Sequence, residues 1–73
     1  MASETVKSEI TGKVWKIVLQ PGARVAEEDT IMILESMKME IPVMASVAGT
    51  LTQILVKETE NVAEGQAVAI IEY

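Results

Sequence analysis

An internal repeat of 37 residues limits the fold of this chain more than any other feature of its sequence. When the sequence is shifted by 37 positions, eight residues are identical to their partners, among them Gly12 with Gly49 and the Val-Ala-Glu triplets at 25–27 and 62–64. Apolar positions between these identities also match, and the register holds without a gap. Because each half is too short to bury an apolar face alone, the repeat predicts two similar half-sheets, clasped about a pseudo-twofold axis around one shared core.

The local pattern indicates strands and no long helix. Residues 14–19 are mostly β-branched or bulky, and they lie between Gly12 and the turn signal Pro21-Gly22. Short apolar runs recur at 31–34 and, less cleanly, at 50–56. Residues 26–29 and their repeat partners 63–66 favour tight turns over a helical turn, since the second stretch contains a glycine. The expected fold class is therefore all-β.

Length and composition exclude several classes of function. A chain of 73 residues forms one domain, and the absence of Cys and His removes disulfides, thiolate nucleophiles, common zinc ligands and Ser-His pairs. A net charge of −5 disfavours nucleic acid and anionic membranes as partners. No leader segment or long apolar run is evident, so we expect a soluble, cytoplasmic protein. We also expect no catalytic residue and no metal site, and the acidic residues 27–29 are interpreted as a solvated turn.

The hinge between the two copies is Met37-Lys38. A hairpin with these two residues at its centre pairs Ser36 with Met39, Glu35 with Glu40, Leu34 with Ile41 and Met32 with Val43. The apolar pairs then share one face. By the same symmetry, both chain ends should lie at the opposite end of the molecule, and Lys38 should protrude.

This hairpin breaks two local rules. Two-residue hairpin turns prefer Asn-Gly, because both residues need positive φ, so Met37-Lys38 predicts a strained turn. Glu35 and Glu40 also face each other as like charges. Such departures concentrate at functional sites, which makes the hinge the first candidate.

The segment Glu35-Ser36-Met37-Lys38-Met39-Glu40 resembles the attachment motif of biotinyl domains, the biotin carboxyl carrier family, in which a lysine between two methionines is covalently biotinylated. The resemblance covers nearly the whole chain, including the Ala48-Gly49 turn and residues 62–66. It implies a single biotinyl domain over residues 1–73. The implied fold is a flattened barrel, or hammerhead sandwich, of two pseudo-twofold-related four-stranded halves with the lysine on a protruding hairpin.

The resemblance also implies a function. A non-catalytic carrier with biotin on Lys38 would ferry a carboxyl group between the biotin carboxylase and carboxyltransferase sites of a biotin-dependent carboxylase. Its partners would be a biotin protein ligase, the biotin carboxylase and the carboxyltransferase, and a mobile carrier is expected to be monomeric. Met37 and Met39 would form a recognition surface, the alternative being that they fill gaps in the core. Glu35 would assist discrimination by the ligase, the alternative being plain solvated surface.

Two alternatives remain open from the sequence. A lipoyl-type carrier shares the fold, but lipoyl lysines are typically preceded by Asp and followed by a small residue, unlike Met37 and Met39. An unmodified structural adaptor would not need a lysine at the symmetric tip.

Some residues depart from the family pattern or have no assigned role. The usual glycines near Glu28 and Thr59 are missing, which predicts less ideal turns there. The short segment between the first two turns predicts that no thumb loop is present. Trp15 is interpreted as core or partly buried packing, the alternative being a role in docking a partner.

Overall fold

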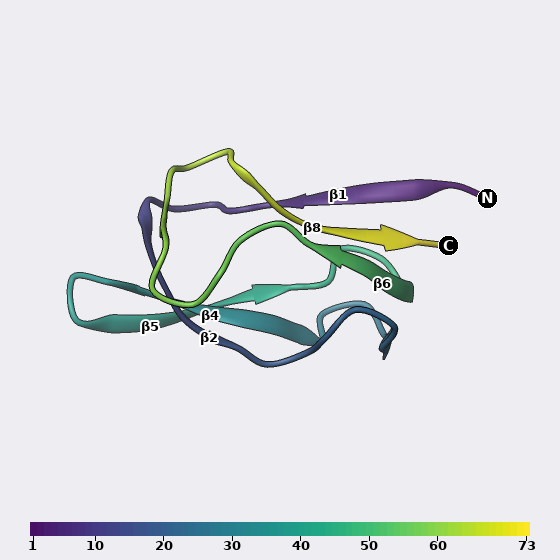
Figure 1. Cartoon of the computed structure of the whole chain (residues 1–73), viewed down its shortest axis with the longest axis horizontal. Coiled ribbons are helices and arrows are strands. Elements are labelled where there is room, and N and C mark those ends of the chain that lie inside the picture. The colour runs from purple at the N-terminus through teal and green to yellow at the C-terminus, as the bar shows by residue number, and fades with distance from the viewer.

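The computed structural model describes all 73 residues as eight strands without a helix. The strands are β1 Ser3–Lys7, β2 Gly12–Ile17, β3 Arg24–Val25, β4 Thr30–Ser36, β5 Met39–Met44, β6 Gly49–Ile54, β7 Asn61–Val62 and β8 Ala67–Glu72. They form two four-stranded antiparallel sheets, here named sheet A (order β1-β8-β6-β3) and sheet B (order β5-β4-β2-β7). The predicted all-β fold is confirmed (Figure 1).

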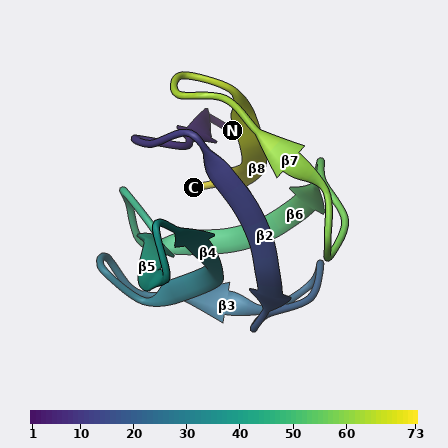
Figure 2. The same cartoon turned by 90° about the vertical axis from the view of Figure 1, so that its left-hand side faces the viewer.

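The sequence repeat appears directly in the strand order. A shift of 37 residues carries β2 onto β6 and β3 onto β7 with identical bounds, and it carries β1 and β4 onto β5 and β8. Every strand of sheet A thus has its partner at the same place in sheet B, which confirms the pseudo-twofold arrangement (Figure 2). Each sheet nevertheless takes two strands from each half of the sequence. Neither half supplies all four strands of a sheet, so both copies are needed to complete each sheet.

One aliphatic core lies between the sheets, as the lack of phenylalanine requires. Its 14 buried hydrophobic residues come from both halves, and all except Ala45 and Val56 form matching pairs: Val6, Val14, Val25, Ile31, Met32, Leu34, Val43, Ala45, Leu51, Val56, Val62, Val68, Ala69 and Ile71. Fully buried side chains of this kind stabilise the fold by about 1.5 to 3 kcal/mol each relative to exposure. The symmetric core gives the hairpin of sheet B a rigid base.

Trp15 lies outside this core. In β2, Val14 pairs with Leu34 while Lys16 pairs with Ile33, so Trp15 is the extra residue of a β-bulge. Its side chain is 49% exposed, so Trp15 is partly buried, which is one of the two placements expected, and it is not a core residue. A bulge at the matching residue Thr52 interrupts β6 in the same way.

Two strands are shorter than the apolar runs at 14–19 and 50–56 that predicted them. They end at Ile17 and Ile54. The next residues, Val18 and Leu55, donate their N–H groups to Ile31 O and Val68 O, both at 2.9 Å, and their side chains are 45% and 44% exposed. Apolar character therefore continues past the point where the sheet pairing stops.

The two departures from the family's glycine pattern fall on left-handed backbone. Glu28 and Thr59 both have φ of 76°. Their repeat partners are Gly65, with φ of 85°, and Gly22, with φ of 100°. The turns that lack glycine thus hold the same conformation as their glycine-containing copies, which confirms that they are less ideal.

The chain ends lie side by side, away from the hairpin. Ala2 and Tyr73 exchange backbone hydrogen bonds of 3.0 and 2.9 Å. The molecule is elongated, with extents of 37, 19 and 18 Å, and the β4–β5 connection and the two chain ends lie at opposite ends of the long axis (Figure 1). The predicted position of the termini is confirmed.

Candidate functional site

The hairpin of β4 and β5 has the register that the sequence predicts. Ser36 pairs with Met39, Glu35 with Glu40, Leu34 with Ile41 and Met32 with Val43. The inward Leu34 and Val43 are buried, so the core holds this register in place. Met37 and Lys38 are the two residues left to connect the strands.

The connection is a strained two-residue turn. Met37 has φ of 52° and Lys38 has φ of 64°. Positive φ at both central residues is the signature of a type I′ turn, whose twist matches that of the paired strands. A residue other than glycine in this region costs roughly 1 to 2 kcal/mol. The strand pairing offsets this cost and keeps the β4–β5 connection, which consists of Met37 and Lys38, at one end of the molecule (Figure 1).

The side chains at the turn face solvent. Met37 is 92% exposed and Met39 is 62% exposed, and Lys38 between them is exposed as well. Neither methionine fills a gap in the core. The amine of Lys38 is therefore accessible and is flanked by two unbranched, polarisable side chains.

The hairpin is held against its neighbours by residues that were not predicted to have a role there. The Ser36 hydroxyl donates to Thr11 O at 3.2 Å, and the Thr11 hydroxyl accepts from the Glu64 N–H at 3.1 Å. A Cβ on Gly12 would lie 2.8 Å from Glu35 O, so only glycine lets β2 pass this close to the hairpin. The identity of Gly12 and Gly49 in the repeat was the signal for this close approach.

A row of charged residues crosses sheet B next to the turn. Glu35 in β4 pairs with Glu40 on one side and with Lys13 on the other, and all three are exposed. The like charges of Glu35 and Glu40 oppose each other, while Lys13 provides a cation beside Glu35. The chain contains no group of three or more His, Cys, Asp or Glu placed to hold a metal ion.

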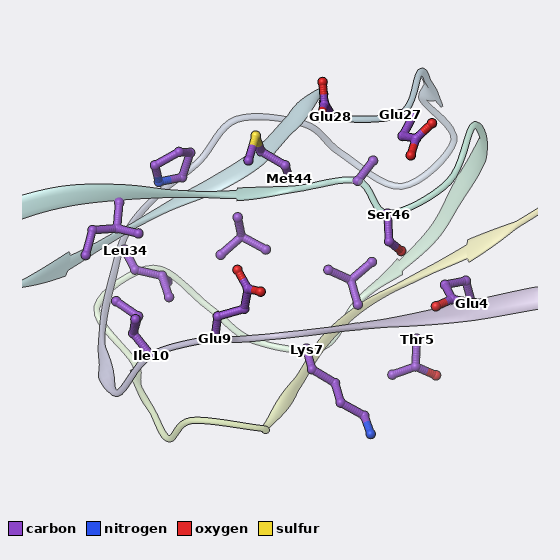
Figure 3. A pocket seen from close by; sticks show the side chains of 15 residues that line it. Glu4, Thr5, Lys7, Glu9, Ile10, Glu27, Glu28, Leu34, Met44 and Ser46 are labelled. Atoms are coloured by element: carbon purple, nitrogen blue, oxygen red, sulfur yellow. The ribbon is translucent and has the colours of Figure 1, made fainter.

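A groove of about 550 Å³ lies elsewhere, between the edge strands β1 and β5. Its lining mixes apolar residues with four carboxylates, Glu4, Glu9, Glu27 and Glu28, and one cation, Lys7. Glu9 points into the groove from the segment after β1 (Figure 3). Lys38 is not part of this lining, so the groove and the hairpin turn are separate features.

Comparisons with known proteins point to one family. The chain is 38% identical over 69 residues to the Biotinylated protein TB7.3 homolog of Mycobacterium leprae, covering 94% of this chain and 97% of that protein. It is 36% identical over 64 residues to the Biotin carboxyl carrier protein of Streptococcus mutans, covering 88% of this chain and 49% of that protein. The Kluyveromyces lactis urea carboxylase structure superposes with a TM-score of 0.93 at 38% identity, covering 99% of this chain but only 6% of the carboxylase.

The chain has no helix, and so it has no helical segment that could span a membrane.

The family model described as "Biotin-requiring enzyme" matches residues 1–71. This match and the relatives described above together establish that the chain belongs to this biotin and lipoyl attachment family.

Proposed function

We propose that this chain is a biotin carboxyl carrier, a single non-catalytic domain over residues 1–73 that carries covalent biotin on Lys38. The proposal rests on one observation above all: within the matched family region, Lys38 occupies the exposed two-residue turn of the β4–β5 hairpin. The relatives' names, a biotinylated protein and a biotin carboxyl carrier protein, support the choice of biotin. The similarity to a carboxylase structure supports the choice of carboxyl transfer.

The geometry suits attachment and transport. Ligation would join the Lys38 Nζ to the biotin carboxyl carbon through an amide bond. The ligase would first activate the biotin carboxyl with ATP as an acyl adenylate, and the deprotonated amine would then displace AMP, so the amine must be one that an enzyme can surround. A turn at the end of an elongated body provides such an amine. Bound biotin supplies a ureido nitrogen that accepts and gives up a carboxyl group. Tethering raises the effective concentration of the carried group at each partner site.

The partners follow from this role. We infer a biotin protein ligase that modifies Lys38, and the biotin carboxylase and carboxyltransferase components that use the carrier in turn. We infer that the carrier is a monomer in the cytoplasm, because it would have to reach each of these partners in turn. The exposed Met37 and Met39 would form the recognition surface on either side of the amine, and Glu35 would help the ligase discriminate among lysines.

The first experiment is intact and peptide mass spectrometry after incubation with a biotin protein ligase, ATP and biotin. We expect a single biotinyl group on Lys38. Lys38→Arg should abolish the addition while leaving the fold intact, because the exposed arginine keeps the charge. Lys57→Arg, at another exposed lysine, is the matched control and should be biotinylated normally.

Two results would contradict the proposal. Absence of biotin on a folded wild-type chain, followed by lipoylation of Lys38 with a lipoyl ligase, would assign the chain to the lipoyl carriers. A folded Lys38→Arg variant that still supports carboxylation in a reconstituted carboxylase would remove Lys38 from the mechanism.

A further inference from the structure

The outer faces of the two sheets differ, although their backbones correspond strand for strand. On sheet B the bulge residue of β2 precedes the exposed Lys16, which pairs with β4, and one residue of β4 and one of β5 continue this row across the sheet. On sheet A the matching positions lie in β6, β8 and β1. The three residues on sheet B are Trp15, Ile33 and Pro42, and those on sheet A are Thr52, Ile70 and Thr5. We name the first set the Trp15 stripe.

The Trp15 stripe is an apolar surface that the fold itself does not need. Trp15 is 49% exposed, Pro42 is exposed and Ile33 is partly exposed. On sheet A the bulge residue Thr52 instead donates its hydroxyl to Ile70 O at 3.1 Å. The bulge itself is thus compatible with a small polar residue, and the indole on sheet B is not a requirement of the architecture.

The Trp15 stripe belongs to the same sheet as the hairpin turn. Ile33 precedes Lys38 by five residues along β4 and the turn, a distance of about 15 Å at the rise of a strand. The exposed charged row of Lys13, Glu35 and Glu40 lies between them. The turn, the charged row and the stripe therefore form one continuous surface. An apolar anchor beside polar residues is the usual composition of a protein interface.

The length of the lysine side chain indicates which partner this surface fits. An unmodified lysine has only four methylenes, so an enzyme that acts on Nζ must bring its own surface against the body of the domain. After biotinylation the arm is much longer, and later partners can reach its end from further away. Building on the proposed function, we propose that the Trp15 stripe is a second docking surface for the biotin protein ligase that modifies Lys38, with Trp15 as its anchor.

The kinetic test exchanges residues between the two sheets. Trp15→Thr gives sheet B the bulge residue of sheet A, and Thr52→Trp places an indole at the matching position on the other sheet. With a ligase that modifies the wild-type chain, Trp15→Thr should lower kcat/KM for biotinylation at least tenfold, mainly through KM, as expected for a buried tryptophan anchor. Trp15→Phe should retain most of the rate, and Thr52→Trp should leave it unchanged.

Nuclear magnetic resonance provides a readout that needs no variant. Trp15 is the single tryptophan of the chain, so its indole N–H gives one resonance. Titrating the ¹⁵N-labelled wild-type chain with unlabelled ligase, without biotin or ATP, should shift or broaden this resonance together with the amides of Met37 and Met39. The amide of Thr52 should not respond.

The outcomes separate this inference from the proposed function. A wild-type chain that is not biotinylated would overturn both. A wild-type chain and Trp15→Thr variant modified at Lys38 with equal kcat/KM would overturn the docking surface alone. An indole resonance that stays fixed while the turn amides shift would also reject the docking surface. An indole resonance that shifts when the concentration of the chain alone is raised would reject it too, because the stripe would then mediate self-association.

Discussion

Sheets A and B share strand order, bulges and buried positions, but they end differently. In sheet B, Met37 and Lys38 connect β4 to β5. At the matching end of sheet A, Tyr73 and Ala2 are hydrogen-bonded to each other near the two ends of the chain. The two copies therefore keep apolar residues at the positions that pack into the shared core, whereas their exposed ends differ. A difference between matching exposed positions is thus a guide to residues retained for a partner and not for packing.

The same comparison applies to backbone strain. Each left-handed turn position holds glycine in one copy and a side chain in the other, as Gly22 with Thr59 and Gly65 with Glu28. The turn at Met37 and Lys38 has no second copy, and there both residues are strained. Strain at Glu28 and Thr59, which their glycine partners avoid, lowers stability, whereas strain at Met37 and Lys38 also positions the proposed attachment site.

The largest effect should come from the glycines that let a strand pass close to its neighbour. A Cβ on Gly49 would collide with Glu72 O and lie 2.9 Å from Ile71 Cγ2, while a Cβ on Gly12 would meet Glu35 O at 2.8 Å. We expect Gly49→Ala to lower the free energy of unfolding by about 3 kcal/mol and Gly12→Ala by about 1 to 2 kcal/mol. Urea denaturation followed by circular dichroism measures both.

The two variants should affect biotinylation in the opposite order, with the larger loss of rate in Gly12→Ala. Because Gly12 lies against the hairpin, Gly12→Ala should slow biotinylation of the folded protein, whereas Gly49→Ala should affect only the end that carries the termini. Equal losses in the free energy of unfolding would show that the two close approaches are energetically equivalent. The proposed difference between the two sheets would then not extend to these glycines.

An intermediate effect is expected from exchanging the residues of one turn pair. Thr59→Gly should raise the free energy of unfolding by about 0.5 kcal/mol, since the relief of strain exceeds the entropy that glycine adds to the unfolded chain. The reciprocal Gly22→Thr should lower it by about 1 to 2 kcal/mol, although a Cβ at Gly22 meets no atom within 4 Å. Thermal and urea unfolding of both variants test this, and a destabilised Thr59→Gly would show that its side chain contributes more than the turn costs.

The smallest effect concerns the like charges beside the hairpin turn. Glu35 pairs with Glu40 in sheet B, but the matching pair in sheet A is Glu72 with Ser3. Glu40→Gln should stabilise the fold by a few tenths of a kcal/mol, and Ser3→Glu should destabilise it by a similar amount. Both changes should shrink at 1 M salt, where exposed charges are screened. Changes that persist unaltered in salt would point to packing instead of charge.

Much of the fold was predictable because the repeat and the hairpin signals agree. The register around Glu35 and Glu40 followed from the mirrored residues on either side of Met37 and Lys38, and the structure has the same register. Two features were not predictable. The two-residue strands β3 and β7 are too short to show a period, and a repeat alone does not say which copy supplies each neighbour in a sheet.

The candidate site was predictable in part. Lys38 followed from its place at the hinge, and its assignment as the biotin attachment site came from the motif and remains a proposal. Thr11 and Gly12 were missed because their role depends on contacts with residues more than 20 positions away. The exposure of Trp15 was missed because a bulge becomes visible only when the pairing of Val14 and Lys16 is known.

The opposite placement of the chain ends and Lys38 makes the domain a rigid lever. Joined to a larger protein through either end, the domain would add up to its 37 Å length to the radius that the amine can sweep. The eight strands then act as a rigid spacer as well as a support for the turn, since a folded body of this length keeps its extension, whereas a flexible linker of equal span can become compact. The distance between two sites that such a carrier can serve is thus set partly by the stiffness of its fold.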